Sequence, residues 1–137
     1  IDEGLKKHNR SRSDFEVSYP GFVVTGRTEE EFEKNKAAVS KQIAFYGSTP
    51  AYKPVLAIHG WGDLQIELNR LSKEGKWDDM GGLISDEILN AFAVVGETDD
   101  AVKEFKKRFG DIADRTTANF AVRDQDHRQA VLEVLKS

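Results

Sequence analysis

The residues best suited to chemistry gather in one stretch of the chain. Between Ile43 and Asp63 the sequence reads IAFYGSTPAYKPVLAIHGWGD, which includes two of the three tyrosines, one of the two tryptophans and one of the three histidines. Long irregular segments inside compact domains serve more often as lids or binding loops than as connectors. The sequence therefore predicts an aromatic binding loop, and the alternative is a packed connector whose rings fill a satellite core.

His59 and Ser48 are the polar candidates in this stretch. His59 lies between Ile58 and Gly60, where its ring could hydrogen-bond a carbonyl or a cofactor oxygen, although a lone histidine more often has a structural role. Ser48 and Thr49 could donate to a phosphate or a substrate, and capping or turn bonding is the alternative.

Other kinds of chemistry are excluded by what the chain lacks. It has no cysteine, which rules out disulfides, thiolate metal sites and cysteine nucleophiles. No two histidines have the spacing of metal ligands, so we expect no metal site. The pairs Asp78-Asp79 and Asp99-Asp100 are typical of helix starts. Gly60-Trp61-Gly62 lacks the strand-to-helix setting of a phosphate-binding motif.

The composition indicates one folded domain in water. With 137 residues, of which 39% are hydrophobic and 32% charged, the chain is long enough to bury a core. Its net charge of -4 and pI near 5.4 argue against a nucleic-acid surface, which needs clustered lysine and arginine. No apolar run approaches the ~20 residues of a membrane span, and the amino terminus lacks the apolar core of a signal peptide. We expect a cytoplasmic protein that binds neither nucleic acid nor membrane.

The first third of the chain is expected to supply a strand and a long helix. Residues 1–8 read as a helix already in progress, without a capping residue, which indicates a start inside an element. The segment 15–25 is rich in Phe, Tyr and Val and is interrupted by Pro20-Gly21, which predicts a strand with a bend or bulge. Thr28 to Glu31 matches a capping box and predicts a helix start. Gly47 and Pro50 are expected to end that helix. Its apolar stripe consists of Phe32, Val39, Ile43 and Tyr46.

The remainder is predicted to be helical, with one more strand over 115–122. Residues 93–96 read as a short apolar stretch that leads into the next helix. Strands separated by helices and joined by short loops predict parallel pairing in an α/β fold. The expected helices run from an Asp63 N-cap to Gly75, from Trp77 or only from near Ser85 to Phe92, from a Thr98 N-cap to Phe109, and from a cap at Asp124 or Asp126 over Val131, Val134 and Leu135.

Residues 43–52, 59–63, 86–96 and 114–115 form four motifs. They resemble the C-terminal part of the luciferase-like monooxygenases, and most of all the actinobacterial subgroup thought to use the deazaflavin coenzyme F-420. The likeness spans about Gly4 to Phe120. Members of that family are (β/α)8 barrels of more than twice this length, so the resemblance implies the last part of such a barrel, with two parallel strands and a long helical insertion over 27–96.

The resemblance leaves two positions open for the aromatic stretch. If residues 27–96 are an insertion after the seventh barrel strand, the stretch lies over the active-site face, because the loops after barrel strands build that face. If residues 28–46 are instead the seventh wall helix, Tyr52, His59 and Trp61 lie on the opposite face. We favour the first position.

The resemblance implies an oxidoreductase or monooxygenase that transfers hydride with coenzyme F-420 or FMN and acts on a small-molecule substrate. Gly26, Arg27 and Arg123 would follow the two barrel strands, where anions are often held, and are the expected cofactor residues. This chain would supply a site wall and lid, and the catalytic residues would lie on strands outside it. The alternative is a non-catalytic module for binding or interaction. In either case we expect a homo-oligomer. The expected substrate and lid residues are Tyr46, Ser48, Tyr52, His59 and Trp61.

Overall fold

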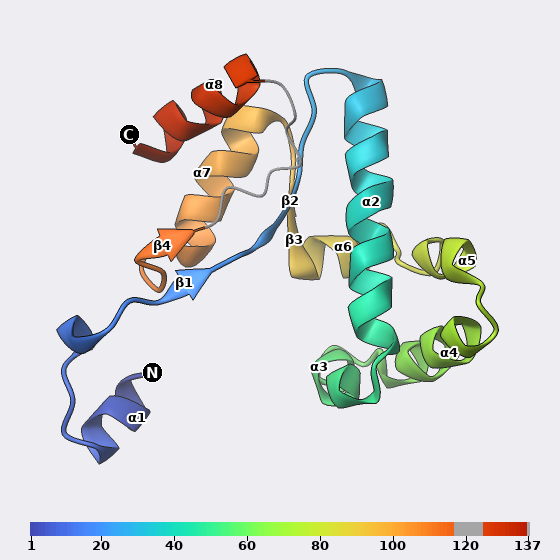
Figure 1. Ribbon diagram of the computed structural model, residues 1–137, viewed down its shortest axis with the longest axis horizontal. Helices are drawn as coiled ribbons and strands as arrows, with labels where there is room; N and C mark the ends of the chain where they lie inside the picture. Colours follow the sequence, from blue (N-terminus) through green and yellow to red (C-terminus); the bar gives the residue numbers. More distant parts are fainter. Residues whose placement is uncertain (117–124, 137) are drawn as a thin grey trace.

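The computed structural model of the chain describes residues 1–116 and 125–136 as a mixed α/β structure (Figure 1). Its strands form two parallel pairs, β1 with β4 and β2 with β3, which confirms the parallel α/β character expected from the sequence. No helix in these ranges combines the length and apolar character needed to cross a membrane.

The helices are α1 (Asp2–Lys7), α2 (Glu29–Ser48), α3 (Lys53–Ile58), α4 (Gly62–Lys73), α5 (Trp77–Gly81), α6 (Asp86–Phe92), α7 (Thr98–Phe109) and α8 (Gln125–Lys136), with 3-10 turns η1 (Arg12–Asp14) and η2 (Pro50–Tyr52). The strands are β1 (Ser18–Tyr19), β2 (Phe22–Val24), β3 (Ala93–Val95) and β4 (Arg115–Thr116).

The β2–β3 pair lies between two hydrophobic clusters. Val24, which is opposite Val95 in the ladder, packs with Ala93 into a cluster that includes side chains of α2, α4, α5 and α6. Val23 and Val94 face the other way and pack with side chains of α7 and α8. Figure 1 accordingly has α2 on one side of β2 and β3, and α7 and α8 on the other. Burial of both faces explains why these short strands are continuously apolar.

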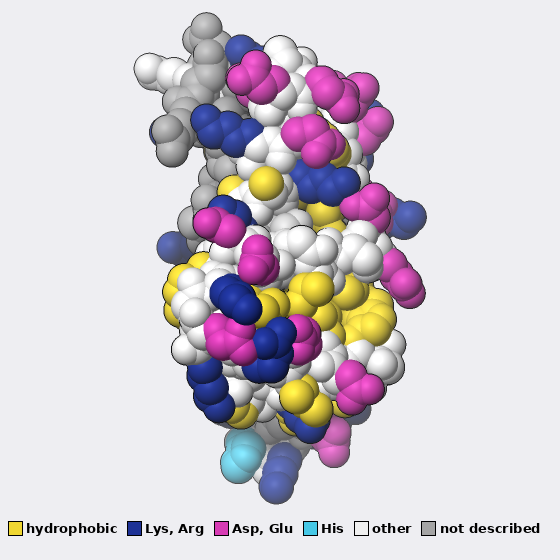
Figure 2. Space-filling view, turned by 90° about the vertical axis from the view of Figure 1, so that its right-hand side faces the viewer, with side chains coloured by type: hydrophobic (Ala, Val, Ile, Leu, Met, Phe, Trp, Pro, Cys, Tyr) yellow, Lys and Arg dark blue, Asp and Glu magenta, His cyan; other side chains and the backbone are white. Residues whose placement is uncertain are grey.

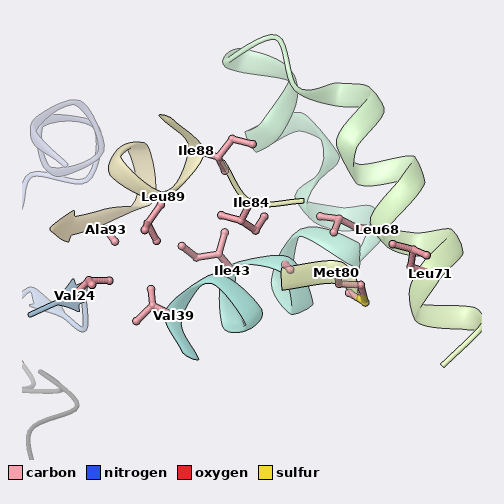
Figure 3. Packing of buried hydrophobic residues seen from close by; sticks show 11 residues of the cluster. Val24, Val39, Ile43, Leu68, Leu71, Met80, Ile84, Ile88, Leu89 and Ala93 are labelled. Atoms are coloured by element: carbon pink, nitrogen blue, oxygen red, sulfur yellow. The ribbon is translucent and has the colours of Figure 1, made fainter. Parts of the chain in front are cut away.

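The larger cluster holds the helical segment against β2. Figure 3 shows its side chains converging from α2, α4, α5 and α6. Leu68 of α4 is completely buried, and its Cδ1 lies 3.0 Å from the position that a Cβ would take on Gly47. The absence of a side chain at Gly47 therefore lets α4 pack closely against α2. The buried members are Val24, Val39, Ile43, Ala44, Leu68, Leu71, Met80, Ile84, Ile88, Leu89 and Ala93.

Helix α2 begins where the capping box predicts. The hydroxyl oxygen of Thr28 accepts a hydrogen bond from the backbone N–H of Glu31 at 3.2 Å. The carboxylate of Glu31 accepts from the backbone N–H of Arg27 at 3.0 Å, one residue before the expected donor. Both bonds satisfy donors that the helix itself leaves without acceptors.

Helix α2 ends just before Pro50, as predicted, but it does not end at Gly47. Gly47 lies inside the helix, which continues to Ser48. The carbonyl of Ser48 accepts hydrogen bonds from Nε2 of Gln65 at 3.1 Å and from Nδ2 of Asn69 at 2.9 Å, both on α4. The prediction that Gly47 ends the helix was wrong because packing against α4 and these two amide donors outweigh the low helix propensity of glycine.

The aromatic stretch 43–63 is helical, so the prediction of an irregular loop was wrong. Between α2 and α4 it forms η2 and α3, and their prolines, Pro50 and Pro54, lie in the first turn of each. Proline is tolerated there because the first N–H groups of a helix have no acceptor within it. The N-cap of α4 is Trp61, and the expected cap Asp63 lies in its first turn.

Strand β3 is the element that the sequence prediction missed, since residues 93–96 were expected only to lead into a helix. The N-cap of α7 is Glu97, one residue before the expected Thr98. The helix start at Ser85 is confirmed, because its hydroxyl accepts from the N–H of Ile88 at 3.3 Å. Of the strand expected over 115–122, the structure describes the first two residues, which form β4. Residues 117–122 and the expected cap Asp124 lie outside the described residues.

The predicted bend at Pro20-Gly21 is confirmed, and it sends β1 to a different partner from β2. Beside the β1–β4 pair, Oδ2 of Asp114 accepts from the backbone N–H of Val17 at 2.7 Å and from Nη2 of Arg12 at 2.6 Å. The same two residues form a second hydrogen bond, in which the carbonyl of Val17 accepts from the backbone N–H of Asp114 at 2.9 Å. One carboxylate thus joins segments 97 residues apart in sequence.

Replacing Asp114 with asparagine is expected to lower the Tm at neutral pH. The pKa of the Asp114 carboxyl lies below its ordinary value, chiefly because of the Val17 N–H and then the Arg12 guanidinium. Because this pKa is lower in the folded protein, the ionised carboxylate contributes to stability above about pH 4, the ordinary pKa of aspartate. The contribution is lost as the pH falls through the lowered pKa of the folded state. The difference in Tm between wild type and Asp114→Asn should therefore narrow on acidification.

The matched control is Asp111→Asn, at an exposed neighbour of Asp114. Thermal unfolding between neutral pH and about pH 3 would compare the three proteins. A Tm difference for Asp114→Asn that stays constant over this range would contradict the role of the ionised carboxylate.

Candidate functional site

The carboxyl ends of β2 and β3 open on one cleft. Each strand is followed by a glycine, Gly26 after β2 and Gly96 after β3, and then by the start of a helix. The cleft has a volume of about 770 Å³. Its lining comes from the first turns of α2 and α7 and the residues just before them: Gly26, Arg27, Thr28, Glu29, Phe32, Gly96, Glu97, Thr98, Asp99, Asp100 and Lys103.

Buried polar contacts fix the floor of this cleft. Thr25 has no exposed surface, and its hydroxyl lies 3.2 Å from that of Thr98. The carbonyl of Thr25 accepts from Nδ2 of Asn35 at 2.6 Å, which ties the end of β2 to α2. The N–H of Gly96 donates to the carbonyl of Val24 at 3.1 Å and extends the β2–β3 ladder by one bond. Both strand ends are therefore held in place by residues of the helices that follow them.

Gly26 has no room for a side chain. A Cβ on this residue would lie 2.4 Å from the backbone nitrogen of Phe32 and 2.9 Å from the carbonyl carbon of Glu31. The first turn of α2 thus packs directly on the backbone that follows β2. This contact turns the amino terminus of α2 toward the cleft.

The cleft brings positive and negative groups together. The amino termini of α2 and α7 both border it, and the N–H groups of a first helical turn carry a partial positive charge. Arg27 and Lys103 add two cations. Lys103 lies 3.8 Å from the carboxylate of Asp100, but both side chains are well exposed, so this pair is weak. The lining carboxylates, Glu29, Glu97, Asp99 and Asp100, outnumber these cations, so an anion held here has to lie beside the cations and the helix amino termini.

The predicted cofactor residues Gly26 and Arg27 both line this cleft. The third, Arg123, lies outside the described residues. Within the ranges 1–116 and 125–136, no group of three or more His, Asp or Glu side chains is placed to hold a metal ion.

The residues predicted to contact substrate lie at the opposite end of the β2–β3 pair. The ring of Tyr46 contacts those of Phe22 and Tyr52, with centroids 6.2 and 5.8 Å apart. His59 and Trp61 stack at 4.9 Å with 16° between their planes.

Two further contacts place these residues at the amino ends of the strands. The stacked rings of His59 and Trp61 both form T-shaped contacts with the ring of Phe92, the residue just before β3. Ser48 is buried, and its hydroxyl donates to the carbonyl of Phe45 at 2.7 Å, as expected for the capping alternative. The structure therefore separates Tyr46, Ser48, Tyr52, His59 and Trp61 from Gly26 and Arg27.

This separation follows from the path of α2. The helix starts beside the carboxyl end of β2, extends over twenty residues and ends near the amino ends of β2 and β3, from which α3 to α6 lead into β3 (Figure 1). This path favours the second of the two positions considered from the sequence, with residues 28–46 as a wall helix. In Figure 2, charged side chains dominate the upper part of this face, and hydrophobic side chains are exposed among charged ones in the lower part.

The sequence prediction gave no site role to Gly96 and Thr98, which line the cleft, or to Thr25 and Asn35, which hold the end of β2 beside it. A signal for them is present in the sequence. Val-Val-Thr-Gly-Arg-Thr-Glu-Glu at 23–30 and Val-Val-Gly-Glu-Thr-Asp-Asp at 94–100 both place a Gly-x-Thr motif and two acidic residues after paired valines. The two strand ends are built alike, and the second copy marks β3.

Comparison with known proteins gives three kinds of result. The family model described as luciferase-like monooxygenase matches residues 1–115. Uncharacterized proteins of Mycobacterium tuberculosis and Mycobacterium bovis are 49% identical over 130 residues, which are 95% of this chain and 38% of each relative. A 5,10-methylenetetrahydromethanopterin reductase of Archaeoglobus fulgidus is 28% identical over 115 residues, covering 78% of this chain and 32% of the reductase. The chain thus spans less than half the length of these relatives. No solved structure is significantly similar to it.

Proposed function

Since this chain belongs to the luciferase-like monooxygenase family, we propose that it is part of an oxidoreductase that transfers hydride with coenzyme F-420 or FMN. The Archaeoglobus relative, which is named as a reductase, supports hydride transfer as the reaction type. The bound coenzyme would supply the ring atom that accepts or donates the hydride. This chain would help to bind and orient the coenzyme, and the residues in contact with the reacting atoms would come from elsewhere in the protein.

The observation that carries this proposal is the meeting of two parallel strand ends and two helix amino termini at one cleft. In (β/α)8 barrels the active site lies at the carboxyl ends of the strands, and phosphate groups are often held at helix amino termini there. Gly26 lets the first turn of α2 pack against the end of β2, and Arg27 and Lys103 provide positive charge at the cleft.

The donor set fits one phosphate of the coenzyme. Arg27, Lys103 and the first N–H groups of α2 and α7 would hold it, as charge-assisted hydrogen bonds are the stronger kind. Glu97 and Asp99 would keep additional negative charge away from the same place. We assign the aromatic residues of α3 and its neighbours no contact with the coenzyme, because they lie at the other end of the β2–β3 pair.

Coenzyme titration of the whole protein tests this function. Replacing Arg27 with alanine should weaken the binding of FMN or coenzyme F-420 about tenfold, because a hydrogen bond to a charged group contributes roughly 1.5–3 kcal/mol. Lys53→Ala is the control, since it removes the same charge from an exposed residue at the distant end of the molecule and should leave the dissociation constant unchanged.

Two results would contradict the proposal. Equal weakening by Arg27→Ala and Lys53→Ala would mean that the cleft does not hold the phosphate. Failure of the wild-type protein to bind either coenzyme would favour the alternative, a non-catalytic interaction module, for which homo-oligomer formation is the readout in light scattering.

A further inference from the structure

A second cavity lies at the amino ends of β2 and β3, away from the cleft. Its volume is about 300 Å³, roughly that of ten water molecules in the liquid, which is at the lower end of the range for small-molecule sites. The cavity is lined by Phe22 of β2, by Tyr46 of α2, and by Tyr52, Val55 and Leu56 of η2 and α3. The prolines that start η2 and α3 therefore shape this cavity by turning the chain back over the end of α2.

The lining of this cavity has no charged residue. No lysine, arginine, histidine, aspartate or glutamate of the described chain contributes to it, although 32% of the sequence is charged. The carboxyl-end cleft, with two cations and four carboxylates, is its opposite in this respect. Placing an ion in such surroundings without a partner is costly, so the lining selects against charged ligands.

The cavity offers flat rings and phenol hydroxyls. Tyr19, Tyr46 and Tyr52 supply the only side-chain hydrogen-bonding groups among its described lining residues. The rings of Tyr46 and Phe22 stand 6.2 Å apart at 45°, and those of Tyr46 and Tyr52 stand 5.8 Å apart at 56°. Tilted rings at these spacings are suited to contact a further aromatic ring at an edge or a face.

We propose that this cavity binds a neutral aromatic molecule of one or two fused rings that carries a hydrogen-bonding oxygen. The apolar lining would bury the rings, and a tyrosine hydroxyl would hydrogen-bond the oxygen. The site goes beyond the proposed coenzyme function, because it lies at the other end of the β2–β3 pair and shares no lining residue with the cleft.

The test uses 2-naphthol and its anionic counterpart 2-naphthoate at neutral pH. Titration of the whole protein, followed by the fluorescence of the ligand, should give saturable one-site binding of 2-naphthol. 2-Naphthoate, with the same rings and a charge, should bind at least about tenfold more weakly, since charge burial costs more than 1.4 kcal/mol.

A matched pair of variants on α3 locates the site. Val55 lines the cavity and is 42% exposed, while Ile58, three residues further along the same helix, is 83% exposed and does not line it. Val55→Asp should weaken 2-naphthol binding at least about tenfold, and Ile58→Asp should leave it unchanged. Tyr52→Phe keeps the ring and removes the hydroxyl, so it should weaken binding a few-fold without disturbing the fold. Arg27→Ala should have no effect, which separates this site from the coenzyme cleft.

Several outcomes would overturn the proposal. They are the absence of saturable binding, equal affinity for the neutral and anionic probes, or equal loss in Val55→Asp and Ile58→Asp. Light scattering adds another: if the wild-type protein is a dimer that Val55→Asp converts to a monomer, a second copy of the chain occupies this surface and the cavity is not a ligand site.

Discussion

Replacing Leu68 with alanine is expected to lower the free energy of unfolding by about 2–5 kcal/mol. Leu68 has no exposed surface and belongs to the larger hydrophobic cluster. Its Cδ1 fills the space left by the missing side chain of Gly47, so the truncation would open a void between α4 and α2. Unfolding in urea, followed by circular dichroism, measures the difference.

The control for this substitution is Ile66→Ala on the same helix. Ile66 is 53% exposed, and its truncation should change the free energy of unfolding by less than about 0.5–1 kcal/mol. If the two variants lose similar stability, α4 does not pack on α2 through Leu68, and the arrangement of the helical segment would need revision.

Replacing Gly26 with alanine is expected to lower the free energy of unfolding by about 1–3 kcal/mol, although only one methyl group is added. The atoms that the new Cβ would strike belong to the backbone of Glu31 and Phe32, and a helical backbone cannot rotate away as a side chain can. The first turn of α2 would have to shift from the end of β2. Thermal unfolding measures the cost, and coenzyme titration would reveal whether the cleft changes with it.

Gly4→Ala is the matched control, because nothing lies within 4 Å of the position of its Cβ. Gly4 is in α1, where alanine has the higher helix propensity, so this variant should be neutral or more stable by up to about 1 kcal/mol. A Gly26→Ala protein as stable as wild type would mean that α2 does not approach β2 as described.

Local signals in the sequence predicted the elements whose ends are built from neighbouring residues. The cap at Thr28 was recognised because donor and acceptor are three residues apart. The helix start near Ser85 was also predicted, but the cap formed by the Ser85 hydroxyl was not. The bend at Pro20-Gly21 was recognised from residue type alone. Gly47 and the prolines of the aromatic stretch were misread because tertiary contacts decide their role. The continuation of α2 through Gly47 depends on Leu68, Gln65 and Asn69, which lie on another helix.

The candidate site was predicted in part for the same reason. Gly26 and Arg27 follow a strand that its composition reveals, and both line the cleft. The partner strand β3 is only three residues long and is apolar without alternation, so it could not be told from the start of a helix by its pattern. Without β3, the sequence did not show that the segment after β2 returns to the amino end of a neighbouring parallel strand. The aromatic stretch was therefore expected at the same end of the strands as Gly26, whereas the structure has it at the opposite end.

Burial of the β2–β3 ladder on both faces has a consequence for its alignment. Where one face of a strand is polar, a slip of one residue exposes apolar side chains and is strongly disfavoured. Here a slip of β2 by one residue would exchange Val23 and Val24 between the two hydrophobic clusters, so hydrophobicity alone discriminates poorly between alignments. The polar contact just beyond the ladder discriminates instead, since the Thr25–Thr98 hydroxyl pair joins the residues that follow β2 and β3 and forms in one alignment only. Thr98, which lines the cleft, thereby also helps to prevent the strands from sliding.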